Sequence, residues 1–275
     1  MKNKVEKVIE DFGNEWTSYP QEDISEAELR NSFDDYFRIV DLSALPEGSV
    51  AADIGCGSGR WAKLVAPHVG TLYCVEPSSA IEVARRNLAD ARNVRFIASD
   101  LESMPIDDAS LDFLYCLGVL HHVPAPQAGI SSCAAKLKPG GRMLAYVYYR
   151  FDFQPVWFRA LWRVSDLARW PISRLPHRLK LATTRLIAAL VYLPLARLSG
   201  LFEHLGADVT NFPLSYYRGR SLYAMKTDAL DRFGTVLEHR FTQPEIRAMF
   251  ERAGFEEIAF SPDKPYWCVT AVKAG

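Results

Sequence analysis

Three glycines and one acid are the residues of this chain best suited to holding a ligand through the backbone. Asp53 ends a short apolar run, and glycines follow at alternate positions: Gly55, Gly57 and Gly59. Glycine adopts positive φ at little steric cost and lets the backbone come close to a bound molecule. The pattern predicts a ligand-binding turn between a buried strand and a helix that begins near Arg60, where free N–H groups point outward.

The spacing of the glycines separates two classes of ligand. A dinucleotide site carries Gly-x-Gly-x-x-Gly and seats a pyrophosphate on the helix N-terminus. Here the pattern is Gly-x-Gly-x-Gly, with Asp53 two residues before the first glycine. A carboxylate at that place repels a pyrophosphate and attracts a cationic or zwitterionic ligand. This argues against a nicotinamide oxidoreductase.

The elements that must position this turn alternate between apolar strands and helical patterns. The expected strands are the run before Asp53 and residues 72–75, 94–98, 111–120, 141–149, 255–261 and 267–272. Such alternation predicts an α/β fold with a doubly wound parallel sheet. Ligands of these sheets lie beyond the carboxyl ends of the strands. Gly55, Glu76, Asp100 and His121 all occupy such ends, which predicts one shared site.

Residues 50–59 together resemble motif I of the class I S-adenosylmethionine-dependent methyltransferases, and the Leu-Lys-Pro-Gly-Gly turn at 137–141 is a second hallmark of that family. The resemblance covers about 45–150 and resumes at about 240–273. The chain is most similar to the broad group that includes quinone-biosynthesis and sugar methyltransferases. The resemblance implies a Rossmann-like, mostly parallel seven-stranded sheet with an antiparallel last strand. It also implies S-adenosyl-L-methionine as cofactor and S-adenosyl-L-homocysteine as product.

The same resemblance implies roles for residues at the strand ends. Glu76 would accept hydrogen bonds from a ribose diol, and Asp100 would meet the adenine amino group. The alternatives are a solvated acid before Pro77 and a helix N-cap, respectively. The expected cofactor-binding residues are Asp53, Gly55, Cys56, Gly57, Gly59, Glu76, Pro77, Ser99, Asp100, Leu101, Leu117 and Gly118.

Two adjacent histidines, His121 and His122, follow the fourth predicted strand. Displacement at a sulfonium carbon releases a neutral thioether, so no metal is required and no metal site is expected. An oxygen acceptor of high pKa needs a base near neutral pH, which imidazole can provide. Adjacent residues leaving a strand face opposite ways, so one of the two is expected to reach the pocket as the catalytic base. For each, a structural histidine bonded to a backbone carbonyl is the alternative.

Composition sets further bounds. The chain has 275 residues, of which 49% are hydrophobic, enough for one α/β domain with an insertion. Its net charge of −1 exerts no global attraction on nucleic acid, and no nucleic-acid partner is expected. The first residues lack the apolar core of a signal peptide, which favours a cytoplasmic location. The five cysteines form no C-x-x-C pair, which favours buried free thiols: Cys56, Cys74, Cys116, Cys133 and Cys268.

Two segments lie outside the resemblance. Residues 1–44 are expected to form an N-terminal helical segment that either folds over the cofactor or clads the sheet edge. Residues 151–226 are expected to be a basic helical insertion within a methyltransferase domain of 45–150 and 227–275. The insertion holds eleven Lys/Arg and four acids, a net charge of +7 (11 − 4).

Three interpretations of 151–226 stay open. It is a lid that shapes the acceptor site, a surface for peripheral membrane contact, or a lobe for core extension or homodimerisation. Tryptophan and arginine beside apolar faces suit a membrane boundary. The run 186–196 has eleven residues without a charge, short of the roughly 20 that span a bilayer.

The expected function is methyl transfer from S-adenosylmethionine to an oxygen or nitrogen of a small or lipid-linked acceptor. A non-catalytic regulatory or assembly subunit that binds the same cofactor is the alternative from another class. The identity of the acceptor does not follow from the fold, because this fold serves oxygen, nitrogen and carbon acceptors alike.

Overall fold

The computed structural model describes residues 2–21 and 23–275, without the side chains of residues 2–4. Met1 and Glu22, both within the expected segment 1–44, lie outside the described residues. The chain forms two compact units. Unit 1 comprises the chain up to Gln21, Leu29–Arg150 and Leu237–Gly275. Unit 2 comprises Phe151–Val236 and a short segment that ends at Glu28.

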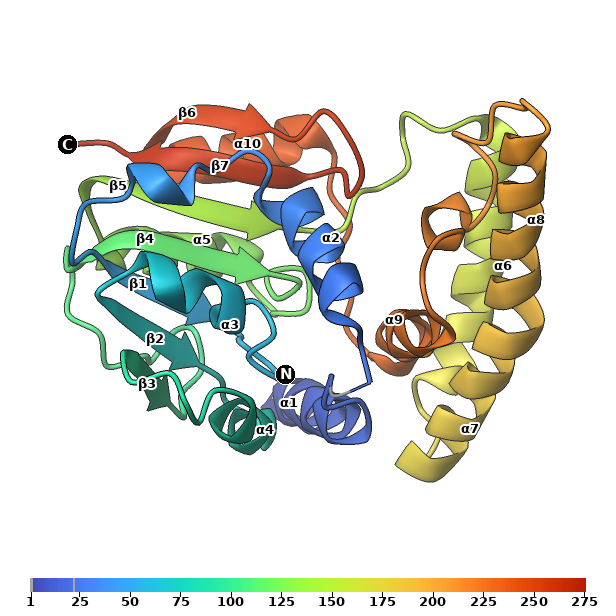
Figure 1. The fold of residues 1–275 in the computed structure, drawn as a ribbon, viewed down its shortest axis with the longest axis horizontal. Helices are drawn as coiled ribbons and strands as arrows, with labels where there is room; N and C mark the ends of the chain where they lie inside the picture. Colours follow the sequence, from blue (N-terminus) through green and yellow to red (C-terminus); the bar gives the residue numbers. More distant parts are fainter. Residues whose placement is uncertain (1, 22) are drawn as a thin grey trace. The chain divides into compact units, whose positions relative to one another are not determined.

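Unit 1 is built on a seven-stranded sheet with the strand order β3-β2-β1-β4-β5-β7-β6 (Figure 1). Strands β1 to β5 pair in parallel, and β7 runs antiparallel to both β5 and β6. The predicted doubly wound, mostly parallel sheet with an antiparallel last strand is therefore confirmed. The strands are β1 Val50–Ile54, β2 Thr71–Val75, β3 Val94–Ile97, β4 Leu111–Leu117, β5 Leu137–Tyr146, β6 Phe255–Phe260 and β7 Cys268–Lys273.

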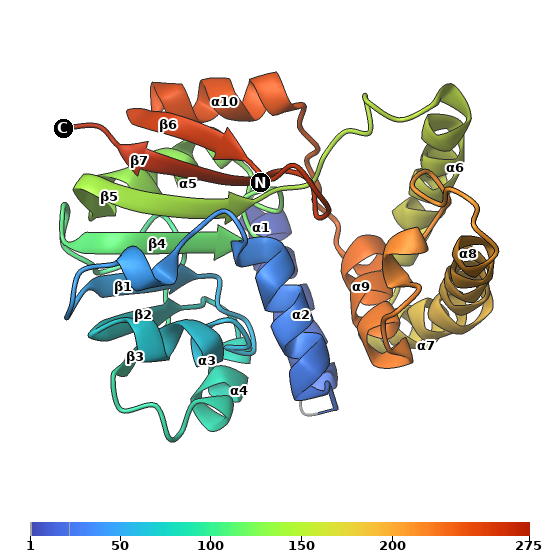
Figure 2. The same cartoon turned by 45° about the horizontal axis from the view of Figure 1, so that its top comes forward.

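Helices cover both faces of this sheet, which explains why its central strands are apolar throughout (Figure 2). On one face, Ile130 and Phe250 from two helices join the core formed by β4 and β5. On the other, the Phe37 ring packs edge-on against Tyr115 of β4, with Trp61 beside it. The helices of this unit are α1 Lys2–Ser18, α2 Glu26–Phe37 from Leu29 onward, α3 Ala62–Val65, α4 Ala80–Asn87, α5 Pro126–Lys136 and α10 Gln243–Arg252.

The end of β4 and both ends of β5 lie three or four residues from the expected positions, and β5 ends at Tyr146 rather than at residue 149. β4 ends at Leu117 rather than at residue 120, because the chain turns at Gly118, whose φ is +84°. β5 begins at Leu137 rather than at residue 141, so the Leu-Lys-Pro-Gly-Gly segment lies within a strand whose pairing with β4 shifts register between Leu111 and Phe113. The first difference changes how the residues after β4 are presented.

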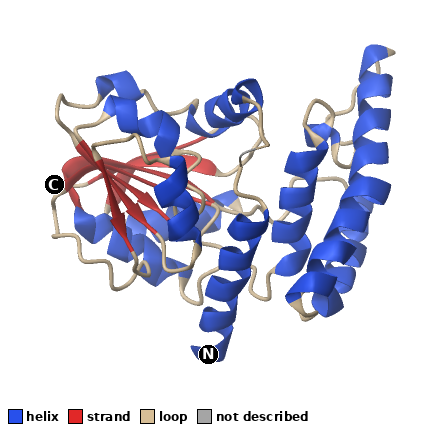
Figure 3. Ribbon diagram, turned by 60° about the horizontal axis from the view of Figure 1, so that its bottom comes forward, coloured by secondary structure: helices blue, strands red, loops and turns tan. Residues whose placement is uncertain are grey.

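Unit 2 is built of helices and loops (Figure 3). Its helices are α6 Val156–Ile172, α7 His177–Ile187, a π-helical turn Ala188–Tyr192, α8 Leu193–His204 and α9 Leu222–Gly234. The core of the unit forms where Ala188, Tyr192 and Ala196 meet Met225 and Ala229 of α9. This packing makes α9 part of unit 2, so the expected domain boundary at residue 227 falls inside a helix.

The segments α7, π-turn and α8 form one helix, His177–His204, of 28 residues. In the described part of the chain it is the one helix long and apolar enough to cross a membrane. The uncharged run 186–196 lies inside it and is much shorter. A helix of this length and apolar composition can also lie in the core of a soluble protein.

Candidate functional site

The glycine turn after β1 is closely packed and requires glycine. Gly55, Gly57 and Gly59 have φ values of +72°, +53° and +76°, which L side chains rarely adopt. A Cβ at Gly57 would lie 2.7 Å from the indole nitrogen of Trp16, which belongs to α1. The backbone of this turn is therefore held in a shape that only glycine permits, with α1 directly against it.

Glu76 lies at the end of β2, as the sequence predicts, and its carboxylate reaches the glycine turn. Its Oε2 accepts a hydrogen bond from the Gly57 N–H at 3.1 Å, and its Oε1 accepts one from the Ser78 N–H at 2.9 Å. The residue is only 6% exposed, whereas the following Pro77 is exposed. Each carboxylate oxygen accepts more than one hydrogen bond, so both retain capacity for a ligand hydroxyl.

Asp53 is buried at the end of β1, with 1% of its surface exposed. Burial raises the pKa of its carboxyl to about 8; the Tyr115 side chain beside it and the Arg60 charge oppose the rise, while the Glu76 charge adds to it. Its Oδ2 has no hydrogen-bond partner among residues 2–21 and 23–275. A buried polar oxygen left without a partner is uncommon, and a cationic or amino group of a ligand would satisfy it.

The residues after β3 form a compact polar turn. Oδ1 of Asp100 accepts hydrogen bonds from the Glu102 N–H, the Ser103 N–H and the Ser103 hydroxyl at 3.0, 2.8 and 2.7 Å. The Ser103 hydroxyl bond is the main cause that lowers the pKa of Asp100. Ser99 donates to the Asp100 carbonyl, and the Leu101 side chain is buried. One oxygen of Asp100 thus stabilises a local turn; the residues that follow Asp100 form this turn and not a helix, so the helix N-cap alternative is wrong.

Open space lies at the end of β4. Leu117 is half-buried, and the Gly118 N–H donates to the Tyr146 carbonyl at 3.2 Å. A Cβ built on Gly118 would meet no atom within 4 Å. β4 is the neighbour in the sheet of β1, the strand that carries Asp53. Cys56 is a buried free thiol, and its hydrogen bond with the Cys74 thiol together with burial raises its pKa, so it is no nucleophile near neutral pH.

The two histidines after β4 lie side by side, with ring centroids 4.2 Å apart. The expectation that they face opposite ways is wrong, because β4 ends at Leu117 and strand alternation does not extend to them. Instead the chain turns, and the His122 N–H donates to the Val119 carbonyl at 2.8 Å. Both residues are buried.

The two imidazoles have different surroundings. His122 Nδ1 lies 2.7 Å from the Leu237 carbonyl; because a carbonyl only accepts, Nδ1 carries the hydrogen. In the neutral ring this tautomer leaves Nε2 with its lone pair. His121 stacks on Tyr148 at 3.8 Å, and neither of its ring nitrogens has a hydrogen-bond partner in the described chain. Burial, with His122 as a secondary cause, holds the pKa of His121 well below its usual range.

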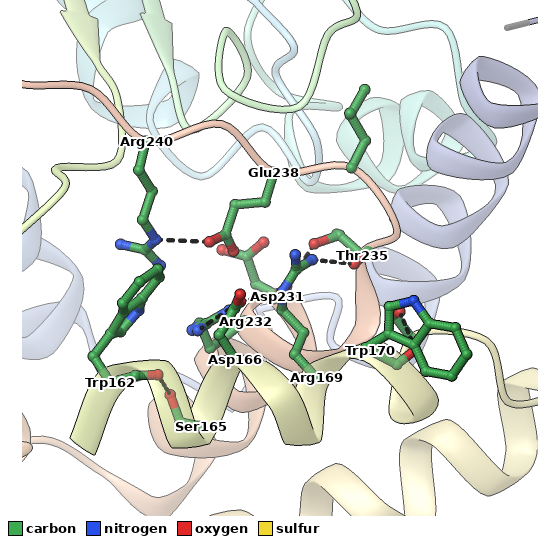
Figure 4. A network of polar contacts seen from close by, with 12 residues as sticks. Trp162, Ser165, Asp166, Arg169, Trp170, Asp231, Arg232, Thr235, Glu238 and Arg240 are labelled. Atoms are coloured by element: carbon green, nitrogen blue, oxygen red, sulfur yellow. Dashed lines mark hydrogen bonds and ion pairs between the residues drawn. The ribbon is translucent and has the colours of Figure 1, made fainter. Parts of the chain in front are cut away.

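Aromatic and basic residues that the sequence analysis did not select surround the pair. Tyr146, the last residue of β5, and Tyr148, two residues beyond it, pack against His121. The Arg240 guanidinium lies 4.8 Å from the Tyr148 ring centre. Arg240 also pairs with Glu238 at 2.7 Å (Figure 4). The sequence could have pointed to these tyrosines: both fall within the expected strand 141–149, and residues two apart on a strand share a face.

α1 contributes to the same region. The Phe12 ring meets His122 edge-on at 5.0 Å, and Trp16 covers the glycine turn. The Arg60 guanidinium lies 5.0 Å from the Trp16 ring centre. α1 therefore lies against both the glycine turn and His122. In residues 2–21 and 23–275, no group of three or more His, Cys, Asp or Glu is placed to hold a metal ion.

Comparison with known proteins fits this geometry. Residues 52–145 match the family model described as methyltransferase domain. The chain is 31% identical over 147 residues to the ubiquinone biosynthesis O-methyltransferase of Coxiella burnetii, a match that covers 46% of this chain and 63% of that protein. It is 34% identical over 126 residues to the probable tRNA methyltransferase 9B of Mus musculus, covering 42% and 27%. The chain thus spans less than two thirds of these curated relatives.

Solved structures share the fold. In the complex between the Haloferax volcanii Trm112 methyltransferase activator and the putative methyltransferase, the matched chain has a TM-score of 0.53 and 15% identity, over 96% of this chain and 98% of that one. Identity at that level shows the fold alone. This chain has the sheet order and the glycine turn of the class I methyltransferase fold, and its residues 52–145 match the methyltransferase-domain family model. Its cofactor is S-adenosylmethionine.

Proposed function

We propose that this chain transfers a methyl group from S-adenosylmethionine to an oxygen or nitrogen atom of a small or lipid-linked acceptor. The main support for the proposal is one hydrogen bond: the Gly57 N–H of the glycine turn donates to the Glu76 carboxylate at 3.1 Å. Unsatisfied polar atoms of Asp53 and His121 adjoin the same edge of the sheet.

The residues of unit 1 divide the work of holding the cofactor. Glu76 offers its remaining lone pairs to the ribose hydroxyls, and Asp53 offers Oδ2 to a cationic group. The turn after Ile97, with Ser99, Asp100 and Leu101, lies at the next strand end and would border the adenine. Gly118 leaves open space at the end of β4, the strand next to β1.

The bound cofactor supplies a methyl group on a sulfonium, from which a neutral thioether departs. The protein then has to align the acceptor atom with that methyl and keep water out. Correct orientation of two reacting groups can lower a barrier by roughly 7–11 kcal/mol in favourable cases. The half-buried aromatic rings of Tyr146, Tyr148 and Phe12 are suited to exclude water.

His122 is the better candidate for the base. Its Nδ1–H is directed to the Leu237 carbonyl, which fixes the ring and leaves Nε2 to accept a proton from an acceptor hydroxyl or ammonium. His121 stays neutral because burial lowers its pKa, and it stacks beside Tyr148. We therefore assign His122 the proton transfer and His121 a positioning role.

The relatives support two kinds of acceptor. The ubiquinone biosynthesis enzyme is an O-methyltransferase, which favours an oxygen acceptor on a small or lipid-linked molecule. The relatives named as probable tRNA methyltransferases favour a nucleic acid as the second candidate. The expectation of no nucleic-acid partner is thus left for experiment to decide.

One experiment separates these candidates. The full chain is incubated with methyl-labelled S-adenosylmethionine and three fractions of cell extract: lipids, water-soluble small molecules and tRNA. Label is expected in one of the first two fractions, whereas label in tRNA would support the second candidate. Calorimetric binding of the cofactor with no label in any fraction would instead support a non-catalytic subunit.

A further inference from the structure

Every exposed large hydrophobic side chain that the structure describes lies in unit 2, between Phe153 and Leu205. Fifteen side chains meet this description, and they belong mainly to α6, α7 and α8. Soluble proteins scatter such residues singly over their surface, whereas a concentrated apolar surface marks a binding face. Unit 2 therefore presents a face that needs a partner.

α6 turns two of its polar side chains, Asp166 and Arg169, towards the rest of unit 2. Asp166 accepts a hydrogen bond from Arg169 Nε at 3.0 Å and forms an ion pair with Arg232 of α9 at 3.4 Å (Figure 4). Arg169 Nη1 in turn donates a hydrogen bond to the Thr235 carbonyl. On the outer side, Val164 is 64% and Leu167 is 75% exposed. No described residue of α6 is buried. A helix that packs through its ion pairs and exposes its aliphatic stripe is built for an apolar surrounding on its outside.

Positive charge borders this apolar stripe. At 100° per residue, Arg159 and Arg163 lie one turn apart along one margin of the stripe, with Trp170 in the same sector. The segment 156–204 holds eight Lys/Arg and two acids, a net charge of +6 (8 − 2). Both acids are already paired, Asp166 as above and Glu203 with Arg218. Apolar faces bordered by arginine and tryptophan are typical of helices that lie in a membrane interface.

The helix His177–His204 adds a second outer face. Leu179, Leu186 and Leu190 recur at spacings of seven and four residues and are all exposed. The opposite side packs on α9 through Ala188 and Tyr192. Crossing a bilayer would strip this helix from α9 and carry Arg185 into hydrocarbon, so the packed arrangement favours a helix that lies flat.

We propose that the outer faces of α6 and the helix His177–His204 dock unit 2 on an anionic phospholipid bilayer, with the helices parallel to the surface. Leucines and Val164 enter the acyl boundary, and Arg159 and Arg163 meet the phosphates. A symmetric dimer through the same face would bring one copy of these arginines towards the other, which costs free energy, whereas an anionic headgroup layer complements them. The proposal concerns binding only and does not depend on methyl transfer.

The test is flotation of the full chain with vesicles of phosphatidylcholine alone or mixed with phosphatidylglycerol. The native chain should bind the mixed vesicles and lose binding as salt rises, because screening weakens the arginine contacts. The double variant Val164→Glu with Leu167→Glu should lower the partition coefficient by about tenfold or more, since each change replaces inserted apolar surface with a charge. The matched control is Ala207→Glu with Asn211→Glu, which adds the same charge on exposed loop residues of unit 2.

Arg159→Gln with Arg163→Gln tests the electrostatic part. It should weaken binding to phosphatidylglycerol vesicles and flatten the salt dependence. Equal binding of the native chain, the Val164/Leu167 variant and the control would overturn the proposal, as would no binding to either vesicle by a chain that still binds cofactor. Lipid-free sedimentation that shows a dimer, dissociated by the Val164/Leu167 variant and kept by the control, would replace the bilayer with a second copy.

Discussion

The Glu76 carboxylate accepts a hydrogen bond from the Gly57 N–H at 3.1 Å, which ties the end of β2 to the turn after β1. One side chain therefore fixes the glycine turn and faces the place expected for the ribose. A substitution at Glu76 has two separable consequences: loss of a ligand contact and loosening of the turn. Glu76→Gln keeps an oxygen that can accept from Gly57, whereas Glu76→Ala removes both functions.

Glu76→Ala should weaken S-adenosylmethionine binding by about 1.5–3 kcal/mol, the range for hydrogen bonds to a charged group. Titration calorimetry measures this directly, and Glu76→Gln should lose less because it preserves the turn. Glu82→Ala is the matched control, since that carboxylate lies exposed on α4 and pairs with Arg85. Unchanged affinity in Glu76→Ala would mean that the ribose is held elsewhere.

The buried carboxyl of Asp53 should make stability fall as pH rises. Its pKa is about 8 in the folded chain and near 3.9 when unfolded, so between these values only the folded state keeps the proton. Its stabilising contribution is fully present below about pH 4 and is lost as pH rises through about 8. The thermal midpoint of the native chain, followed from pH 5 to pH 9, should therefore decline.

Asp53→Asn isolates this contribution from those of other titrating groups. The amide is nearly isosteric and does not ionise, so the midpoint of this variant should fall less over the same pH range. Parallel curves for the native chain and the variant would show that Asp53 is not the titrating group. Saturating S-adenosylmethionine should reduce the difference, because a cationic ligand stabilises the carboxylate.

Gly57→Ala should cost more stability than a typical glycine replacement. It would meet strain from a φ of +53° and overlap with the Trp16 indole. Gly48→Ala is the matched control, because Gly48 has a φ of +74° and open space around its Cβ position, so it bears only the backbone cost of about 1–2 kcal/mol. Denaturant unfolding gives both values. If the overlap with Trp16 destabilises Gly57→Ala, adding Trp16→Ala should recover part of the lost free energy of unfolding. If the effects of the two substitutions on that free energy simply add, Trp16 does not constrain the turn.

The elements whose signals are local could be predicted from the sequence. Thr242 and Glu245 cap α10 reciprocally, as the spacing indicates, and the glycine turn and the Glu76 position follow directly from the pattern. Each depends on residues a few positions apart, so backbone geometry alone decides it. The sheet topology follows from the alternation of such elements and the handedness of their connections.

What the sequence analysis got wrong depends on contacts between distant segments. The His121 and His122 rings are adjacent because Gly118 ends β4, and His122 is fixed by the carbonyl of Leu237, more than a hundred residues away. α9 belongs to unit 2 because Met225 and Ala229 find their partners on α7 and α8. The sequence also could not predict that the apolar stripe of α6 faces outward. Periodicity shows that a helix has an apolar stripe, but it does not show whether that stripe packs against the rest of the protein.

Replacing His122 should separate catalysis from cofactor binding. If Nε2 takes the acceptor proton, His122→Ala should lower turnover by about 10²–10⁴-fold, the usual contribution of a general base, with little change in cofactor affinity. His122→Asn offers a gentler test, because its amide can donate to the Leu237 carbonyl in place of Nδ1–H but cannot take a proton near pH 7. His121→Asn is the matched control: a positioning role predicts a smaller fall in turnover and a pH–rate profile of unchanged shape. Turnover near the native level in both single variants from pH 6 to pH 9 would exclude base catalysis by this pair and leave alignment alone to drive the reaction.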